Sequence, residues 1–180
     1  MILRKLEPRD AEPMLAWMHD PETVGLLKTD FMNKTTADCL VFIEATRDES
    51  KNLHRAVAND TDRYLGTVSL KGIDQKRKTA EFAITVGPEG RGTGAAAFAM
   101  AEMLQTAFEK LGLETVYWYV NRENRRAIRF YEKQGFQPLT ARPAETPEAD
   151  EDPRMVWFLC KAGQKPVFSD HEIKAEKFRP

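Results

Sequence analysis

The strongest constraint on this 180-residue chain is a glycine-rich joint between an apolar run and a helix-like run. The joint is VGPEGRGTGAAAF, Val86–Phe98, and the run before it is TAEFAITV, Thr79–Val86. Glycine lets a backbone turn sharply and lets a ligand approach the main chain without meeting a Cβ atom. The first amides of a helix lack internal partners and carry the positive end of its dipole. The joint therefore predicts a phosphate-binding site.

Composition narrows the class of protein. The formal net charge of -1 shows no basic excess, so we expect no nucleic-acid partner. No apolar run is long enough to span a membrane, and the first residues carry no signal-like apolar region. Cys39 and Cys160 stand far apart without metal or redox spacing. We therefore expect a cytoplasmic protein with no membrane contact and no metal.

The periodicity of apolar residues predicts one α/β domain over residues 1–162 and a polar C-terminal extension over residues 163–180. A helix capped by Thr35 or Thr36 should bury Leu40, Ile43 and Cys39. A proline-rich acidic loop over residues 141–153 separates two late strands. The predicted strands are 1–5, 53–58, 64–70, 79–86, 115–120, 136–139 and 155–160, and the long helix after the joint ends at Gly112.

A nucleoside-triphosphate loop is the first alternative at the joint. It requires the pattern GxxxxGK[ST]. Gly87 and Gly92 have this spacing, but Thr93 stands where the lysine is needed. The missing charge disfavours this class of ligand.

A dinucleotide-binding fingerprint is the second alternative. Gly92, Gly94 and Ala97 form G-x-G-x-x-A, and Glu114 follows about 20 residues later. In that fingerprint the acidic residue ends the next strand, whereas Glu114 precedes the strand-like run TVYWYV. This alternative stays open as a remote one.

Two sequence blocks favour a third ligand. Arg91, Gly94 and Ala96 give R-x-x-G-x-A between a strand and a long helix. The second block follows the next strand and has the pattern N-x-x-A-x-x-x-Y-x-x-x-G-F, carried by Asn124, Ala127, Tyr131, Gly135 and Phe136. Two blocks in this order and at this separation resemble the GNAT superfamily of acetyl-CoA-dependent N-acetyltransferases. The resemblance covers about Thr79 to Leu139.

The resemblance implies a fold and a co-substrate. The fold is α/β (α+β), with a mixed, mostly antiparallel central sheet flanked by helices and with splayed cofactor-binding strands. Acetyl-CoA would place its pyrophosphate on the amides of the joint and its pantetheine arm between the strands 79–86 and 115–120. The implied cofactor-binding residues are Ala83, Ile84, Thr85, Val86, Arg91, Gly92, Thr93, Gly94, Ala95, Ala96, Asn124, Ala127 and Tyr131. Asn124 would also suit the N-cap of the following helix.

The resemblance also implies catalytic residues for an acyltransferase that transfers the acetyl group directly to a primary amine. Tyr131 matches the tyrosine that protonates the leaving thiolate. Glu81 lies early on the cofactor strand, where related enzymes place a general base. His19 and His54 are alternative bases because histidine titrates near neutrality. Neither cysteine lies in a nucleophile motif, so we expect no acyl-enzyme.

The acceptor amine is constrained more weakly. In this family it is bound by the first helices, their connection and a late loop, here 17–36 and 141–153. Trp17, Asp20-Pro21 and 28–31 are similar to the ribosomal-protein N-terminal acetyltransferase branch, which also includes enzymes acting on nucleotide-linked amino sugars. Trp17 and Lys28 are the candidate substrate-binding residues. We expect a small amine such as an amino sugar, with a protein N-terminus as the alternative.

Two further possibilities follow from the same residues. A GNAT-like domain also suits a non-catalytic acetyl-CoA-binding module, although Tyr131 and Glu81 argue for turnover. Strand edges in such folds often pair, so a homodimer is a further expectation.

Overall fold

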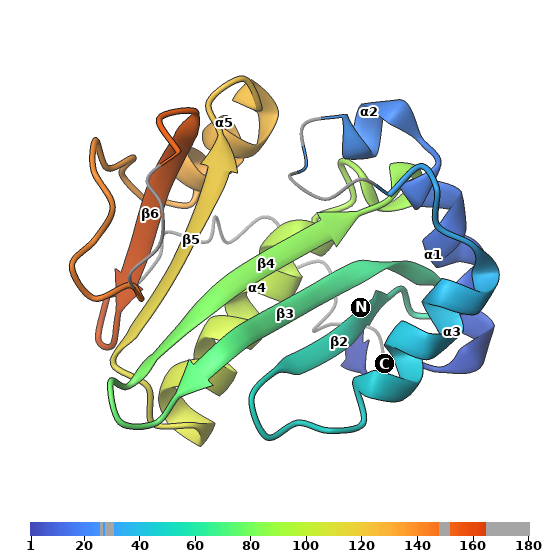
Figure 1. The fold of residues 1–180 in the computed structure, drawn as a ribbon, viewed down its shortest axis with the longest axis horizontal. Coiled ribbons are helices and arrows are strands. Elements are labelled where there is room, and N and C mark those ends of the chain that lie inside the picture. Colours follow the sequence, from blue (N-terminus) through green and yellow to red (C-terminus); the bar gives the residue numbers. More distant parts are fainter. Residues whose placement is uncertain (26, 28–30, 148–151, 165–180) are drawn as a thin grey trace, which may run out of the picture.

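The computed structural model describes residues 1–25, 27, 31–147 and 152–164. One sheet organises these residues, with helices on both of its faces (Figure 1). Among them, no helix is long and apolar enough to cross a membrane. In chain order the elements are β1 (Ile2–Arg4), η1 (Pro8–Asp10), α1 (Ala11–Met18), α2 (Pro21–Val24), α3 (Thr36–Ala45), β2 (Leu53–Ala58), β3 (Tyr64–Asp74), β4 (Thr79–Val86), η2 (Pro88–Gly90), α4 (Ala95–Gln105), η3 (Thr106–Lys110), β5 (Thr115–Asn121), α5 (Arg125–Lys133) and β6 (Met155–Lys161).

The six strands lie side by side in sequence order, β1 to β6. Every neighbouring pair is antiparallel except β4 and β5, which are parallel and joined by the long helix α4. This arrangement is the mixed, mostly antiparallel sheet that the resemblance implied.

The strands β4 and β5 separate along their length. Their pairing covers only Thr79–Glu81 against Thr115–Tyr117, whereas β4 stays paired with β3 as far as Val86. Figure 1 shows the two strands diverging toward their carboxyl ends. Because β5 supplies no partner beyond Glu81, the outer backbone edge of β4 faces a wedge-shaped opening. The expected splay of these two strands is therefore present.

The larger core lies between the sheet and α4. The side chain of Trp118 is 1% exposed and packs against four aromatic rings, those of Phe82, Tyr131, Phe136 and Phe158. Aromatic side chains contribute large buried areas, so this cluster fixes α5 and its tyrosine against the sheet.

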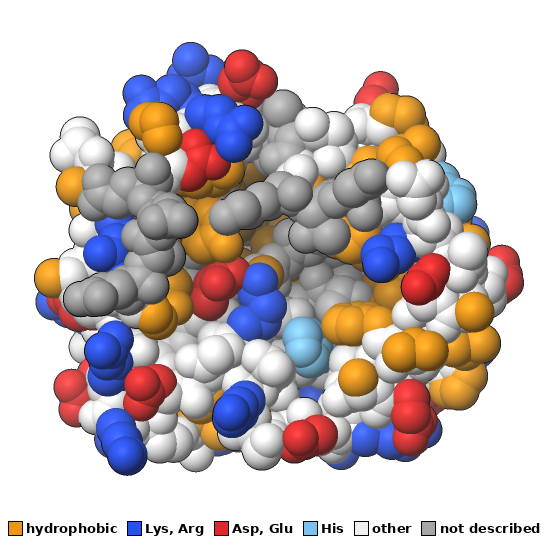
Figure 2. All heavy atoms as spheres, in the orientation of Figure 1, with side chains coloured by type: hydrophobic (Ala, Val, Ile, Leu, Met, Phe, Trp, Pro, Cys, Tyr) orange, Lys and Arg blue, Asp and Glu red, His pale blue; other side chains and the backbone are white. Residues whose placement is uncertain are grey.

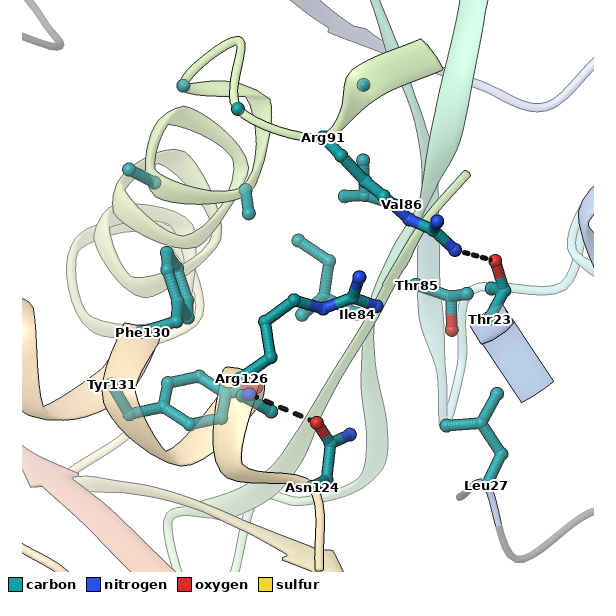
Figure 3. Close-up of a pocket in the computed structure, with 16 residues that line it drawn as sticks. Thr23, Leu27, Ile84, Thr85, Val86, Arg91, Asn124, Arg126, Phe130 and Tyr131 are labelled. Carbon is teal, nitrogen blue, oxygen red and sulfur yellow. Dashed lines mark hydrogen bonds between the residues drawn. The ribbon is translucent and has the colours of Figure 1, made fainter. Parts of the chain in front are cut away.

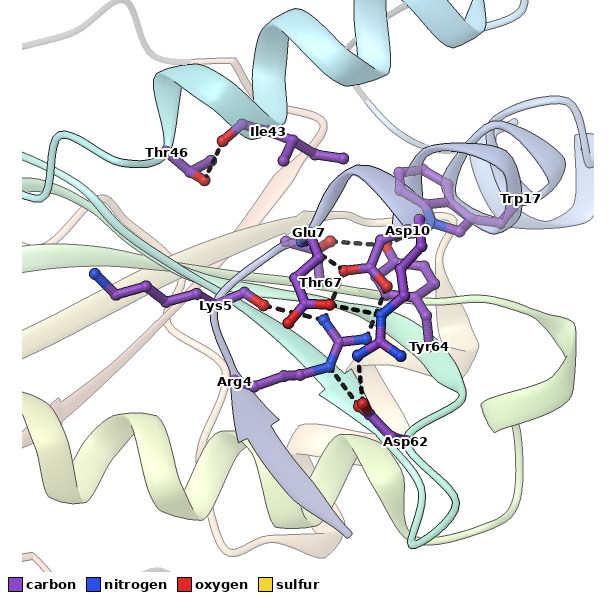
Figure 4. Close-up of polar contacts among 11 residues, drawn as sticks. Arg4, Lys5, Glu7, Asp10, Trp17, Ile43, Thr46, Asp62, Tyr64 and Thr67 are labelled. Atoms are coloured by element: carbon purple, nitrogen blue, oxygen red, sulfur yellow. Dashed lines mark hydrogen bonds and ion pairs between the residues drawn. The ribbon is translucent and has the colours of Figure 1, made fainter.

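A second core holds α1 and α3 against β2 and β3. Trp17 Nε1 donates to the hydroxyl of Tyr64 at 3.1 Å, and that hydroxyl shares a hydrogen bond of 2.7 Å with Thr67 Oγ1 (Figure 4). Burial raises the pKa of Tyr64 to about 12. At the start of α1, Arg4 binds both carboxylate oxygens of the buried Asp10, at 2.7 and 2.8 Å. These contacts set the position of α1 on the sheet.

Three details of the sequence prediction differ from the structure. Cys39 and Ile43 of α3 are buried, but Leu40 is 42% exposed, because it lies one position off the buried stripe. The expected strand over residues 136–139 is reduced to an isolated bridge between Leu139 and Trp157. The strand β3 is longer than expected and runs on to Asp74.

Candidate active site

A cavity of about 280 Å³ opens at the glycine-rich joint, between the end of β4, α4 and α5 (Figure 3). We call it the α4–α5 cavity. Its lining includes many of the residues that the sequence predicted for the cofactor. These are Ile84, Thr85, Val86, Arg91, Gly92, Gly94, Ala96, Asn124, Ala127 and Tyr131.

The joint reaches its shape through left-handed glycines. Gly92 has φ of 73° and Gly94 has φ of 84°, a region that side-chain-bearing residues adopt at a cost. Thr93 braces the turn, since its Oγ1 donates to Gly90 O at 2.8 Å and accepts from Ala95 N at 3.3 Å. Thr93 and Ala95 line neither this cavity nor the second one described below.

The backbone amides of this turn are largely unpaired. Within the described part of the chain, no acceptor faces the N–H groups of Gly92, Gly94, Ala96 and Ala97, and all four residues line the α4–α5 cavity. Several converging amides at the N-terminus of an eleven-residue helix are suited to binding an anion. The residues present thus fit the pyrophosphate of coenzyme A.

The side chain of Arg91 turns away from these amides. Its Nη2 lies 2.8 Å from Asp20 Oδ2 and also bonds to Thr23 Oγ1, while Nη1 lies 3.1 Å from Glu22 Oε2. The hydrogen bond from Thr23, together with Arg91, lowers the pKa of Asp20. The charge of Arg91 is therefore already matched by α2, which it joins to the turn.

A second arginine in the α4–α5 cavity is uncommitted. Arg126 extends from the first turn of α5 toward β4 (Figure 3). It has no hydrogen-bonding or ion-pairing partner among the residues described. The sequence prediction missed this residue, although it stands two positions after Asn124 in the second sequence block.

The second sequence block forms all of α5 and the turn that follows it. Asn124 Oδ1 accepts from Ala127 N at 3.1 Å, so Asn124 is the N-cap of α5 while also lining the α4–α5 cavity. Tyr131 projects into the same cavity from the next turns, and its hydroxyl has no hydrogen-bonding partner among the described residues. Burial raises the pKa of Tyr131, so the phenol holds its proton at neutral pH.

A second cavity, of about 450 Å³, lies between α1, α3 and strands β2 to β4. We call it the α1–α3 cavity. Most of its lining side chains are apolar, among them Trp17, Phe31 and Phe42, and its polar members include His54, Ser69 and Lys71. On the face of the sheet opposite α4, acidic, basic and histidine side chains gather beside hydrophobic ones (Figure 2).

The two cavities meet at β4. Ile84 and Thr85 line both of them, Val86 lines only the α4–α5 cavity, and Ala83 lines only the α1–α3 cavity. Successive side chains of a strand point to opposite faces, so this short stretch of β4 forms the wall between the two spaces.

The remaining predicted residues divide as follows. Trp17 lines the α1–α3 cavity although it is 5% exposed, so it is both a core residue and a wall residue. Glu81 lines neither cavity, and its carboxylate lies 2.6 Å from Lys71 Nζ. Lys28 lies outside the described residues. In the loop over 141–153, the described residues line neither cavity, and residues 148–151 are outside the description.

The structure also shows where His19 and Cys39 lie relative to the two cavities. His19, at the end of α1, lines neither cavity, and its Nε2 lies 2.9 Å from Lys34 O. Cys39 is buried in the wall of the α1–α3 cavity, where burial raises its pKa and keeps it a thiol. The described residues bring together no group of three His, Cys, Asp or Glu side chains suited to a metal ion.

The splayed strands, the amide-lined turn and the buried tyrosine are the features that the resemblance to acetyl-CoA-dependent acetyltransferases implied. Residues 1–137 match the family described as the acetyltransferase (GNAT) domain, so the chain belongs to the GNAT acetyltransferases. It is accordingly an N-acetyltransferase with acetyl-CoA as acyl donor. Membership in this family sets aside the dinucleotide-binding alternative.

Known relatives share part of the sequence. An uncharacterized N-acetyltransferase, p20, of Bacillus licheniformis is 27% identical over 140 residues, which cover 76% of this chain and 79% of that protein. The acetyltransferase PseH of Campylobacter jejuni is 25% identical and covers 73% and 80%. A spermidine N(1)-acetyltransferase of Escherichia coli K12 is 33% identical over 100 residues, or 53% of this chain and 54% of its own length.

The solved structures agree on the fold. A spermidine N-acetyltransferase from Vibrio cholerae, crystallised with CoA and spermine, superposes with a TM-score of 0.74 at 20% identity and covers 89% of this chain and 94% of that one. At this identity the likeness concerns the fold. The expected ribosomal-protein branch gains no support, because the relatives above that are named for a substrate act on spermidine.

Proposed function

We propose that this chain transfers the acetyl group of acetyl-CoA to the primary amine of a small molecule held in the α1–α3 cavity. The observation that carries the proposal is the meeting of the two cavities at Ile84 and Thr85. A donor in one space and an acceptor in the other would approach each other across this stretch of β4. Such proximity alone lowers the barrier of a two-substrate reaction by several kcal/mol, roughly 7–11 at best.

The donor would be held mainly by backbone. The free amides of Gly92, Gly94, Ala96 and Ala97 suit the pyrophosphate, and Arg126 adds a positive charge from α5. The outer edge of β4 beyond Glu81 offers N–H and C=O groups to the amides of the pantetheine arm. Acetyl-CoA supplies the thioester, which this arrangement would place along Ala83–Thr85. A backbone N–H there would stabilise the charge that develops on the carbonyl oxygen.

Tyr131 would serve as the general acid. Its phenol keeps its proton at neutral pH, and its hydroxyl faces the α4–α5 cavity with no partner among the described residues. As the C–N bond forms and the C–S bond breaks, the phenol would give its proton to the departing sulfur. The proton lost by the amine nitrogen then restores the phenol.

The acceptor would carry its amine on a largely apolar body. The described wall of the α1–α3 cavity contains one carboxylate, Asp38, and that group already accepts from Thr35 N and Oγ1 at 2.8 and 2.7 Å. Lys34 and Lys71 lie in the same wall. Lys71 is paired with Glu81, whereas the ammonium of Lys34 has no ion-pairing partner among the described residues. Because this ammonium repels further cations, the wall favours a monoamine such as a deoxygenated amino sugar or an arylalkylamine over a polyamine.

An acetyl-transfer assay tests the proposal. Purified protein is given acetyl-CoA and, separately, glucosamine, phenethylamine, spermidine and a short peptide with a free N-terminus, and the products are identified by mass. We expect N-acetylation of at least one small monoamine at a higher kcat/KM than the peptide. If acetyl-CoA raises the melting temperature but no amine is acetylated, the chain is a binding module and the proposal fails.

A further inference from the structure

The imidazole of His54 is placed in the wall of the α1–α3 cavity. It lies on β2, is half-buried, and stands in one row across the sheet with Ser69 of β3 and Ala83 of β4. Its Nδ1 lies 2.7 Å from Ser69 Oγ, and its ring meets that of Phe42 edge to face at 5.2 Å. The ring is thus held in one orientation from two sides.

The second ring nitrogen is left over. His54 Nε2 has no hydrogen-bonding partner among the described residues and is not fully buried, and the side chain that carries it lines the cavity. When Nδ1 carries the proton and donates to Ser69 Oγ, Nε2 has a free lone pair, and this tautomer can accept a proton at Nε2.

The surroundings keep the ring uncharged before it acts. Burial lowers the pKa of His54, and the positive charges of Lys71 and Arg55 lower it further. Charged and titratable groups contributed by the neighbouring elements of the cavity are Lys34, Asp38, Cys39, Arg55, Lys71 and Glu81. The two carboxylates are engaged elsewhere, since Asp38 accepts from Thr35, the N-cap of α3, and Glu81 is paired with Lys71.

We propose that His54 accepts the proton that the bound ammonium group must lose before it attacks the thioester. This assignment rests on the proposed function and concerns its acceptor side. The ammonium N–H bond breaks and an Nε2–H bond forms, directly or through one water molecule, which leaves a neutral amine with its lone pair. The imidazolium later returns the proton to solvent through the mouth of the cavity. Glu81 then serves to hold Lys71 rather than to take the proton.

The test compares His54→Gln with Glu81→Gln in pH profiles of kcat/KM, using the best acceptor among glucosamine, phenethylamine and spermidine. Glutamine keeps a hydrogen-bonding group beside Ser69 but takes no proton at these pH values. We expect His54→Gln to lower kcat/KM by about 10²-fold or more and to remove the acid limb of the enzyme profile. Glu81→Gln should leave that limb in place, and the affinity for acetyl-CoA should be unchanged in both variants.

Methoxyamine, which is neutral at about pH 7, gives a readout that a structural role would not change. The loss in His54→Gln should shrink to roughly a few-fold with this amine, because no ammonium proton has to be removed. Ser69→Ala is the second variant if His54→Gln is unstable. This substitution keeps the imidazole but removes the hydroxyl that fixes its tautomer. We therefore expect it to lower kcat/KM by about 10-fold.

The outcomes separate two failures. A wild-type protein that acetylates no amine overturns the proposed function and this inference with it. A wild-type protein that is active, with His54→Gln retaining its activity and its acid limb, overturns only the role of His54. Loss of the acid limb in Glu81→Gln would assign the base to Glu81 and overturn the inference equally.

Discussion

The two cavities differ in how the chain builds them. The α4–α5 cavity is lined mainly by two short stretches, 84–97 and 124–131, and it offers chiefly backbone amides together with Arg126, which has no partner among the residues described. The α1–α3 cavity gathers side chains from α1, α3, β2, β3 and β4, and few of them are neighbours in sequence. A pyrophosphate can be bound by any backbone that turns correctly, whereas an acceptor is selected by the shape and charge of side chains. The donor site is therefore a local property of the sequence, and the acceptor site is a property of the fold.

The largest effect should come from the one side chain expected to act chemically on the donor. Tyr131→Phe should lower kcat by about 10²-fold or more, because the leaving sulfur loses its proton source. The dissociation constant for acetyl-CoA, measured by calorimetry, should change less than about 3-fold, since the hydroxyl contributes to the departing sulfur and little to binding. Tyr119→Phe is the matched control, because Tyr119 lies on β5 and lines neither cavity. Unchanged kcat in Tyr131→Phe would remove the acid from the mechanism.

The next effect concerns the two arginines of the α4–α5 cavity. Arg126→Ala should weaken acetyl-CoA binding by about 10-fold, which is within the range for a charge-assisted hydrogen bond. The loss should diminish at high salt, because Arg126 is exposed. Arg91→Ala should chiefly lower the melting temperature, since its guanidinium joins the turn to Asp20 and Thr23 of α2. Arg129→Ala, also on α5 but outside the cavity, is the control.

If instead Arg91→Ala reduced the affinity more than Arg126→Ala, the guanidinium of Arg91 would leave α2 when acetyl-CoA binds. The glycine-rich turn would then change its contacts when acetyl-CoA binds. The donor site would no longer be a preformed, local feature that contrasts with the acceptor site.

Most of the residues that the sequence predicted for the donor lie together in one cavity because their determinants are local. Positive φ at Gly92 and Gly94, the cap at Asn124 and the tyrosine two turns further along α5 each depend on a few consecutive residues. The fold class followed from the same two blocks. Arg126 was missed because an arginine on a helix surface is ordinary in sequence, and only the fold shows that it lies in the cavity with no partner in the described part of the chain.

The acceptor side depended on contacts that no local pattern encodes. Trp17 was expected in the substrate site and is a wall residue, but its position depends on a hydrogen bond to Tyr64, 47 residues away. Glu81 was placed as the base by its position on β4, whereas its pairing with Lys71 follows from the register of β3 and β4. His54 becomes a strong candidate for the general base only in the fold, where β2 places it in one row across the sheet with Ser69 and Ala83.

A smaller effect should follow from changing the charge of the acceptor wall. Lys34 lies exposed at the α1–α3 cavity, and its ammonium has no ion-pairing partner in the described part of the chain. Lys34→Glu should raise the kcat/KM ratio for spermidine over phenethylamine by roughly 3- to 5-fold, the size expected for an exposed charge pair. Affinity for acetyl-CoA should stay constant, with Lys51→Glu as a control remote from both cavities. A ratio that does not move would show that the polyamine is selected by other residues.

The smallest expected effect is on stability, and it concerns the ionisation of His54 in the wall of the α1–α3 cavity. The pKa of His54 in the folded protein is below the ordinary value of 6.5 because of burial and the nearby cations. Between that lowered pKa and about 6.5, the unfolded chain binds more protons than the folded one, so the free energy of unfolding falls as the pH falls. His54→Gln has no proton to bind in either state. Its melting temperature should therefore decline less than that of the wild type between about pH 7 and pH 5, as measured by calorimetry. Ser69→Ala keeps the imidazole buried and should decline as the wild type does, so a loss of acid sensitivity in both variants would point to packing rather than to the charge of the ring.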